Sequence, residues 1–456
     1  MKKKESISES LDQQLSLNKD SKVLIVGLGE TGFSVAKFLH QHAIVFAVVD
    51  SRAKPPFKDT LLQEYPDTPI FTGGFDEAAF NVATHLIVSP GVSLQETSIN
   101  KGLIGGAKLL SDIDLFACAT DKQVVAITGS NGKSTATTML GDMANEAGVK
   151  TAIGGNLGVP ALDLLDEAIE LYVLELSSFQ LERTSKLNAT VATVLNISED
   201  HLDRHLDLKT YAQEKQRVFA GDGVMVLNED DGIVNAMADE SRKIETFSIQ
   251  SKNGFHLSEY QGENWLMDES KPLMRQSDLH VEGLHNVANA LAALAIGQVL
   301  GLQIAAMCKS LHHFKGLSHR MQKIANIKGV NWVNDSKATN VGACVAALNG
   351  YQHKVILIAG GDAKGANMQE LIPAIKQKTK CVVLMGKDAA MIEEAMNGCV
   401  PSFIVNTVKE AVEMAASLAG KGESVLLSPA CASIDQYKNY QERGDKFAAA
   451  VMELAA

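Results

Sequence analysis

Residues 123–140, QVVAITGSNGKSTATTML, decide the fold of the largest part of the chain. They read as a buried strand, a glycine-containing turn and the start of a helix. Backbone N–H groups at such a junction bind anions, while Lys133 can reach the β- and γ-phosphates of a nucleotide and the Ser134 hydroxyl can ligate Mg²⁺. We therefore predict a phosphate-binding loop, although Ile127 stands where the strict motif has its first glycine. The loop comprises Gly129, Ser130, Asn131, Gly132, Lys133, Ser134 and Thr135.

Short β-branched runs alternate with helical patterns on both sides of this loop, which is typical of βα units around parallel sheets. They fall into three blocks, so we predict an α/β protein of three domains. The expected strands are 22–26, 43–50 and 83–89 in the first block, 123–128, 170–176 and 189–196 in the second, and 330–334, 354–359, 380–385 and 424–428 in the third. The expected boundaries are a flexible tail at 1–20 and domains at 21–111, 112–317 and 318–456.

Composition points to an enzyme of small molecules. The chain has 456 residues and 46% apolar side chains, and its net charge of -12 works against nucleic acid or anionic lipid as a partner. The six cysteines lack the spacing of a zinc site or a disulfide framework, which favours the reducing cytoplasm. The apolar stretch 287–308 contains amides and glycines, so we expect a core helix followed by a turn and no membrane insertion.

A second glycine motif lies near the N-terminus. VLIVGLGETG places Gly27, Gly29 and Gly32 in G-x-G-x-x-G spacing after a strand, and Asp50 ends the next strand. The pattern is typical of a dinucleotide fold and leaves an NAD-dependent oxidoreductase open as an alternative. It also fits a purely structural turn, because it reports only a tight connection and a close backbone approach.

Polar side chains follow the strands of the second and third blocks. Glu175 and His201 stand near strand ends that meet at one edge of the sheet, where both could bind Mg²⁺, although a loop histidine explains His201 as well. Asn286 fits a helix N-cap, and Arg320 fits either a phosphate contact or a surface ion pair. The loop with Asp335, Lys337 and Thr339 is polar enough to indicate a site.

Six motifs in order, AITGSNGKST, LELSSFQLE, EDHLDRH, GLHNVANALAA, NDSKATN and LLSPACASIDQYKNYQERG, resemble the Mur ligase family over nearly the whole chain after residue 20. SPACASIDQ and the lack of a DNPR motif favour a member that adds D-glutamate to UDP-N-acetylmuramoyl-L-alanine in peptidoglycan precursor synthesis. A folylpolyglutamate synthase-like ligase of the same fold is the nearer alternative. The resemblance implies a Rossmann-like N-terminal domain, a central P-loop ATPase-like domain with a parallel sheet, and a Rossmann-like C-terminal domain.

The resemblance also implies a reaction and its cofactors. ATP converts the substrate carboxylate to an acyl phosphate, and the amine of D-glutamate attacks it to form an amide. The implied cofactors are ATP and two Mg²⁺ ions, and a monomer in the cytoplasm is expected, acting on small molecules only. Lys215 is implied to be carbamylated, whereas its own surroundings in YAQEKQRVF read as a surface helix.

Site residues are carried over position by position. The implied metal ligands are Ser134 and Glu175 for one ion, and His201 and Lys215 for the other, with Lys133, Glu175, His201 and Lys215 as catalytic residues. The implied nucleotide contacts outside the loop are Asn286, Asn289, Arg320, Asp335 and Lys337. The implied contacts of the UDP substrate are Glu30, Thr31, Ser51, Arg52, Asn156 and His201, and those of D-glutamate are Thr339, Lys364, Ser433 and Tyr440. Two of these depart from the family pattern, since Glu30 brings a carboxylate near a diphosphate and Tyr440 stands where a phenylalanine is expected.

Overall fold

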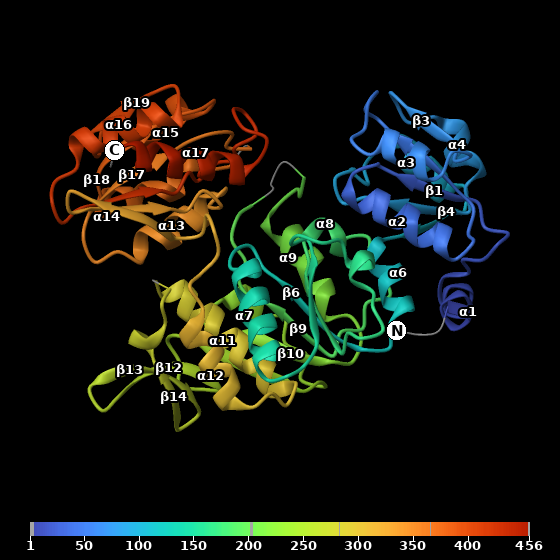
Figure 1. Cartoon of the computed structure of the whole chain (residues 1–456), viewed down its shortest axis with the longest axis horizontal. Helices are drawn as coiled ribbons and strands as arrows, with labels where there is room; N and C mark the ends of the chain where they lie inside the picture. The colour runs from blue at the N-terminus through green and yellow to red at the C-terminus, as the bar shows by residue number, and fades with distance from the viewer. Residues whose placement is uncertain (1–3, 201–203, 282, 365, 455–456) are drawn as a thin grey trace.

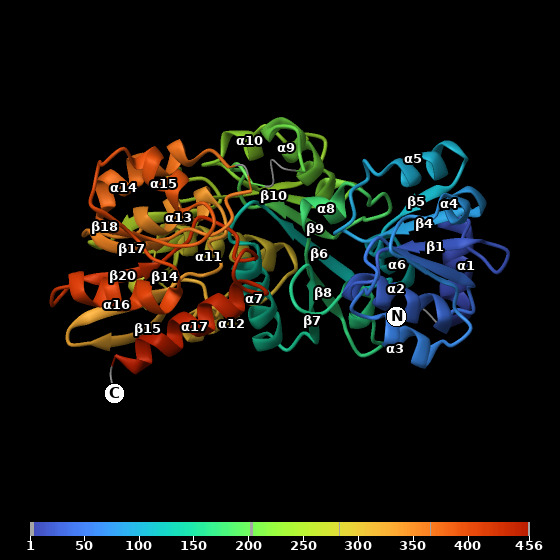
Figure 2. The ribbon, with the colours of Figure 1, turned by 90° about the horizontal axis from the view of Figure 1, so that it is seen from above.

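The computed structural model describes residues 4–200, 204–281, 283–364 and 366–454. Three α/β domains are each built around one sheet, and the central domain lies between the other two (Figure 1). Figure 2 shows the N-terminal and C-terminal domains on opposite sides of the central sheet. Parallel pairing dominates all three sheets, as the alternating pattern of strands and helices predicted.

The N-terminal domain has a five-stranded parallel sheet in the order β3-β2-β1-β4-β5. The strand order reverses between β1 and β4, which run parallel, so the turn after β1 opens at a switch point where ligands of such sheets bind. The strands are β1 (Val23–Val26), β2 (Phe46–Asp50), β3 (Ile70–Thr72), β4 (His85–Val88) and β5 (Lys108–Leu110). The helices are α2 (Glu30–Gln41), α3 (Lys58–Glu64), α4 (Glu77–Val82) and α5 (Thr97–Ile104).

A helix precedes this sheet where a flexible tail was expected. α1 (Lys4–Leu15) buries Ile7, Leu11 and Leu15, and it packs on α6 (Asp112–Ala119) of the central domain. Apolar residues spaced four apart form one stripe on a helix, and burying that stripe stabilises the helix. The expectation of a flexible tail over residues 1–20 is therefore wrong for this segment.

The central domain has a nine-stranded sheet in the order β14-β13-β12-β11-β10-β9-β6-β8-β7. β6 to β12 pair in parallel, whereas β12, β13 and β14 form antiparallel hairpins at one edge, which the sequence analysis did not predict. The strands are β6 (Gln123–Thr128), β7 (Thr151–Gly155), β8 (Leu171–Glu175), β9 (Val191–Val194), β10 (Val224–Asn228), β11 (Ile244–Ser248), β12 (Phe255–Tyr260), β13 (Glu263–Asp268) and β14 (Lys271–Arg275).

Helices cover both faces of this sheet. The apolar stretch 287–308 divides as predicted, with a core helix α11, a turn and then α12. Within the described residues, no helix combines the length and the apolar character needed to cross a membrane. Besides α6, the helices are α7 (Lys133–Glu146), η1 (Ala161–Leu164), α8 (Ser178–Leu181), α9 (Leu208–Gln216), η2 (Arg217–Phe219), α10 (Gly232–Asn235), η3 (Gln276–Asp278), α11 (Leu284–Val299) and α12 (Ile304–His313).

The C-terminal domain has a six-stranded sheet in the order β15-β16-β20-β17-β18-β19, parallel except for the β15–β16 hairpin. The strands are β15 (Gln322–Ile327), β16 (Val330–Asn334), β17 (Val355–Ala359), β18 (Thr379–Leu384), β19 (Ser402–Ile404) and β20 (Ser424–Leu427). The helices are α13 (Val341–Asn349), η4 (Met368–Leu371), α14 (Ile372–Lys378), α15 (Ala389–Met396), α16 (Val408–Leu418) and α17 (Tyr440–Glu453).

Polar contacts join the N-terminal and central domains at α2 and at the connection between the domains. Asp163 in η1 accepts hydrogen bonds from Ser34 Oγ and Lys37 Nζ of α2, each at 2.9 Å. Where the chain passes between the domains, the Ser111 hydroxyl caps α6 and lies 3.0 Å from Thr184 Oγ1. These bonds tie both the helix α2 and the domain connection to the central domain.

Candidate active site

The phosphate loop lies between β6 and α7, in the middle of the central sheet. Gly132 precedes α7 with φ of 81°, and a Cβ there would come within 2.2 Å of the Asn289 side-chain oxygen. Glycine is therefore required by both backbone conformation and space. Lys133 Nζ donates to the carbonyls of Gly129 and Ser130 at 2.7 and 2.9 Å, which holds its ammonium over the loop.

Glu175 ends β8 beside this loop, because β8 pairs directly with β6. Its carboxylate accepts hydrogen bonds from Ser134 Oγ and, at 2.7 Å, from Asn156 Nδ2. Burial alone would raise the pKa of Glu175, but the charge of Lys133 and these two hydrogen bonds lower it, so the carboxylate is held in its charged form. A carboxylate and a hydroxyl side by side are the oxygen ligands that Mg²⁺ prefers.

Lys215 reaches the same place from α9. Its side chain is buried, and Nζ donates to the Gly129 carbonyl at 2.9 Å. Burial, followed by the nearby charge of Lys133, lowers the pKa of Lys215 well below its ordinary value. The interpretation as a surface helix lysine is therefore wrong. The signal that was missed is Tyr211, one turn earlier on the same buried face, whose ring lies 4.6 Å from Nζ.

These groups line one cavity of about 230 Å³ together with Arg320 and Lys337 from the C-terminal domain. His201 lies outside the described residues, whereas its neighbour Asp200 lines this cavity and accepts a hydrogen bond from Asn340 at 3.0 Å. Among the described residues, no three His, Cys, Asp or Glu side chains form a metal-binding group. A metal bound here would therefore use Ser134 and Glu175, together with ligands that are not part of such a cluster among the described residues.

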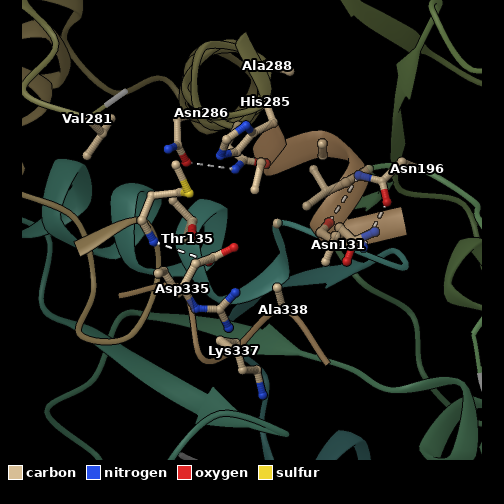
Figure 3. A pocket seen from close by; sticks show the side chains of 18 of the residues that line it. Asn131, Thr135, Asn196, Val281, His285, Asn286, Ala288, Asp335, Lys337 and Ala338 are labelled. Carbon is tan, nitrogen blue, oxygen red and sulfur yellow. Dashed lines mark hydrogen bonds between the residues drawn. The ribbon is translucent and has the colours of Figure 1, made fainter. Parts of the chain in front are cut away.

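A second pocket, of about 200 Å³, lies between the phosphate loop, α11 and the C-terminal domain (Figure 3). Asn286 and Asn289 are joined by a 3.4 Å hydrogen bond on its α11 side. Asn286 is not the N-cap, because α11 begins at Leu284 with Gly283 as the cap. Of the expected nucleotide contacts, this pocket collects Asn131, Gly132, Thr135, Asn286, Asn289, Arg320, Asp335 and Lys337.

The same pocket has walls that the sequence analysis missed. Phe247, His285 and Leu317 line it, as do three alanines of α13. Burial lowers the pKa of His285 to about 4, so its imidazole is neutral at physiological pH. An apolar wall with neutral hydrogen-bonding groups suits a nucleobase, which is flat and uncharged. These residues lie far apart in sequence, so no local motif could identify them.

Arg320 and Lys337 connect the C-terminal domain to the phosphate loop. Arg320 Nη2 donates to Ser134 Oγ at 2.5 Å, which favours a phosphate contact over a surface ion pair. Lys337 Nζ lies 4.1 Å from the centre of the Tyr440 ring. Burial, with the nearby charge of Arg320, lowers the pKa of Lys337 to about 8. Two cations from this domain therefore face the place where phosphates would bind.

A larger cavity of about 920 Å³ extends from the N-terminal glycine turn to Glu175. Beside Gly27 and Gly29, its lining includes the expected UDP-substrate residues Glu30, Thr31, Ser51, Arg52 and Asn156, and also Ser134, Lys337 and Tyr440. Asp50 lies at the same end, where it accepts the Leu28 N–H at 2.7 Å and pairs with Arg52. The carboxylate that would hold a ribose in a dinucleotide fold is thus occupied with the turn itself.

The expected D-glutamate residues are distributed over neighbouring places. Thr339 and Lys364 line a small pocket with Asp200 and Asn340. Tyr440 lines the large cavity instead, and Ser433 is buried in the segment after β20. The structure therefore brings Thr339 and Lys364 together and leaves the role of Ser433 as a prediction.

Comparisons with known proteins agree with this geometry. Three family models match the chain: the N-terminal domain of MurD-like Mur ligases at residues 21–111, the Mur ligase middle domain at 127–297, and the glutamate ligase domain of Mur ligases at 319–431. UDP-N-acetylmuramoylalanine–D-glutamate ligase of Methylococcus capsulatus is 52% identical over 97% of each chain. The protein of the same name from Pseudomonas putida is 47% identical over 95% of this chain and 97% of that one.

Solved structures show the same fold at lower identity. UDP-N-acetylmuramate–alanine ligase MurC of Thermotoga maritima gives a TM-score of 0.61 at 17% identity, over 95% of this chain and 99% of that one. MurF of Acinetobacter baumannii also gives 0.61 at 17% identity, over 98% of each chain. The three-domain arrangement is thus shared by enzymes whose sequences have diverged widely.

Proposed function

The chain belongs to the Mur ligase family, and on that premise we propose that it joins D-glutamate to UDP-N-acetylmuramoyl-L-alanine with the conversion of ATP to ADP and phosphate. It is an ATP-dependent, amide-forming ligase of peptidoglycan precursor synthesis. One observation carries the assignment of its substrate. A single cavity runs from the glycine turn of the N-terminal domain to Glu175 at the phosphate loop, which suits a long substrate with a nucleotide at one end and a reacting carboxylate at the other.

Three cationic side chains of the protein can stabilise the charge of the reacting groups. The reaction brings a carboxylate against the γ-phosphate of ATP, and the two repel each other. Lys133, Arg320 and Lys337 all line the cavity between them and can neutralise the charge that develops in the transition state. The N-terminal turn offers backbone N–H groups to the diphosphate, while Glu30 can turn its carboxylate away.

A metal fits beside Ser134 and Glu175. Their oxygens are adjacent and Glu175 is held as a carboxylate, and Mg²⁺ bound there would offset the charge of the phosphates. We propose two such ions, the second at His201 and Lys215. A bare ammonium at Lys215 would repel a cation, whereas a carbamate offers oxygen ligands.

Burial supports the modification of Lys215. A carbamate forms when a neutral amine attacks CO₂ and gives up a proton, so the amine must first be deprotonated. The buried position and the neighbouring charge of Lys133 both favour the neutral amine. We propose that Lys215 is carbamylated in the working enzyme, where the carbamate would supply oxygen ligands to a metal.

D-glutamate is proposed to enter from the C-terminal domain, near Thr339 and Lys364, with Ser433 and Tyr440 closing the site. No cysteine in the described part of the chain forms a disulfide, which suits a reducing compartment, so we place the reaction in the cytoplasm. That the enzyme acts as a monomer stays a prediction, and sedimentation of the purified chain tests it.

Phosphate release measured with each substrate omitted in turn tests the proposed function. Release should require ATP, UDP-N-acetylmuramoyl-L-alanine and D-glutamate together. A folate substrate with L-glutamate, and NADH with a reducible substrate, serve as the alternative arms. Turnover in either alternative arm, or release without D-glutamate, would contradict the assignment.

A further inference from the structure

A buried arginine of the central domain binds a loop of the N-terminal domain. Arg183 follows α8, and its side chain is fully buried. Its Nη1 donates to the carbonyl of Ser89 at 2.6 Å and to the carbonyls of Val88 and Val92 at 3.3 Å each. Three carbonyls of one short loop therefore converge on one guanidinium that belongs to another domain.

Glu182 offsets part of the positive charge around Arg183. Glu182 pairs with Arg183 and lies 3.6 Å from Arg204, whose own Nη2 donates to the Val92 carbonyl at 3.4 Å. A guanidinium taken out of water is tolerated only when it is paired and hydrogen-bonded. Because those partners lie on both domains, the position of Arg183 and the position of the loop fix each other.

The loop held by Arg183 touches the glycine turn directly. Ser89 Oγ donates to the Gly27 carbonyl at 2.9 Å. A Cβ at Gly27 would come within 3.0 Å of both the Ser89 and the Val92 side chains, so the turn and the loop are packed without spare room. Ser89 and Val92 also line the large cavity, together with the residues between them. A shift of this loop would therefore move the wall of the cavity and the turn at its far end.

We propose that Arg183 is a positioning residue for the UDP-bearing substrate. By fixing the loop at residues 89–92, and through Ser89 the Gly27 turn, Arg183 sets the place of the diphosphate end relative to Glu175 and the phosphate loop. This rests on the proposed function, because it assumes that one substrate spans the large cavity. A displaced diphosphate site would weaken the binding of a substrate whose other end must still reach Glu175.

Arg183→Lys tests the proposal. Lysine keeps the charge but has a single nitrogen, so it cannot bond the loop carbonyls and the Glu182 carboxylate through two separate nitrogens as Arg183 does. We expect the KM for UDP-N-acetylmuramoyl-L-alanine to rise by about tenfold, while the KM values for ATP and D-glutamate change by less than about twofold. The dissociation constant of the UDP substrate, measured by calorimetry without ATP, should rise with the KM.

Arg217→Lys is the matched control. Arg217 donates to the carbonyls of Leu181 and Thr184 at 2.9 and 3.1 Å, so it supports the same segment without reaching the N-terminal domain. The Arg217→Lys variant should leave the KM for the UDP substrate unchanged within about twofold. A general loosening of residues 181–184 would instead raise this KM in both variants and would overturn the proposal.

Ser89→Ala is a second test variant. Ser89 is only half-buried, so this variant should fold. If Arg183 acts through Ser89, the KM increase of the double variant should be smaller than the product of the two single increases, since coupled residues are not additive. Fully multiplicative effects would overturn that route. An unchanged KM in Arg183→Lys would overturn the proposal with the function intact, whereas a wild-type enzyme without turnover on this substrate would refute the proposed function itself.

Discussion

Replacing Asp335 with asparagine should stabilise the C-terminal domain at neutral pH. Burial raises the pKa of Asp335 from 3.8 to about 7, despite hydrogen bonds from Ser428 Oγ at 2.9 Å and from the Met321 N–H at 3.2 Å. In the unfolded chain the carboxyl loses its proton near 3.8, so between that pH and about 7 the folded state holds more protons. Stability of the wild-type domain therefore falls as pH rises through this window and then levels off.

The size of the effect follows from the two pKa values. Each unit of difference corresponds to about 1.4 kcal/mol, so the ionised carboxylate destabilises the fold by about 4 kcal/mol, of which about 2.5 kcal/mol develops between pH 5 and pH 8. Asparagine has the same shape and no charge, and its amide can keep a hydrogen bond with Ser428 and with the Met321 N–H. The stability gained in Asp335→Asn should thus grow by about 2.5 kcal/mol between pH 5 and pH 8.

Urea unfolding followed by tryptophan fluorescence measures this difference. The chain has two tryptophans, and Trp332 lies buried in β16 just before Asp335, whereas Trp265 is in the central domain. A Trp265→Phe background makes the signal specific for the C-terminal domain, and comparing the two proteins at each pH cancels other titrating groups. A difference that stays constant between pH 5 and pH 8, or a loss of stability at pH 8, would refute the reasoning.

Four other outcomes are open to measurement. Lys133→Ala should lower kcat by about a thousandfold or more, because it removes a cation beside the transferring phosphoryl group, and a near-normal rate of phosphate release would contradict the phosphate loop. Lys215→Arg should lose nearly all activity, since arginine cannot become a neutral amine, and an active variant would rule out a carbamate. D-glutamate should be used and L-glutamate should not, so equal rates with the two would exclude the proposed amino-acid site. Leu11→Ala should reduce the free energy of unfolding by about 3 kcal/mol, and an unchanged urea midpoint would mean that α1 does not dock.

Residues with strong local patterns were predicted correctly. β6 and α7 follow from a continuous apolar run and a glycine turn, and α11 follows from a long Ala/Leu-rich stretch. The antiparallel edge of the central sheet was missed. In the structure, Gln261 and Gly262 form the tight turn of a hairpin, with positive φ of 54° and 82°. A two-residue turn is a short signal, and the strands beside it are partly exposed, with polar residues at half of their positions.

The site could be predicted where its functional side chains lie directly after predicted strands. Lys133 and Ser134 begin the helix that follows β6, and Glu175 ends the neighbouring strand β8, so topology alone brings them together. Lys215 and Phe247 could not be found in this way, because their side chains meet the site only through tertiary packing. For Lys215, the resemblance to the Mur ligase family indicated a position in the site, whereas the polar residues around it in the sequence indicated a surface helix.

The contacts between the N-terminal and central domains restrict how these enzymes could exchange parts. A chimera joined near residue 111 would separate Ser111 from its partner Thr184, and Asp163 from Ser34 and Lys37. The exchanged domain would then meet a foreign surface at both places and leave polar groups without partners. A functional chimera would have to include η1 and the segment after α8 together with the N-terminal domain. The unit that can be exchanged is therefore larger than the domain and is discontinuous along the chain.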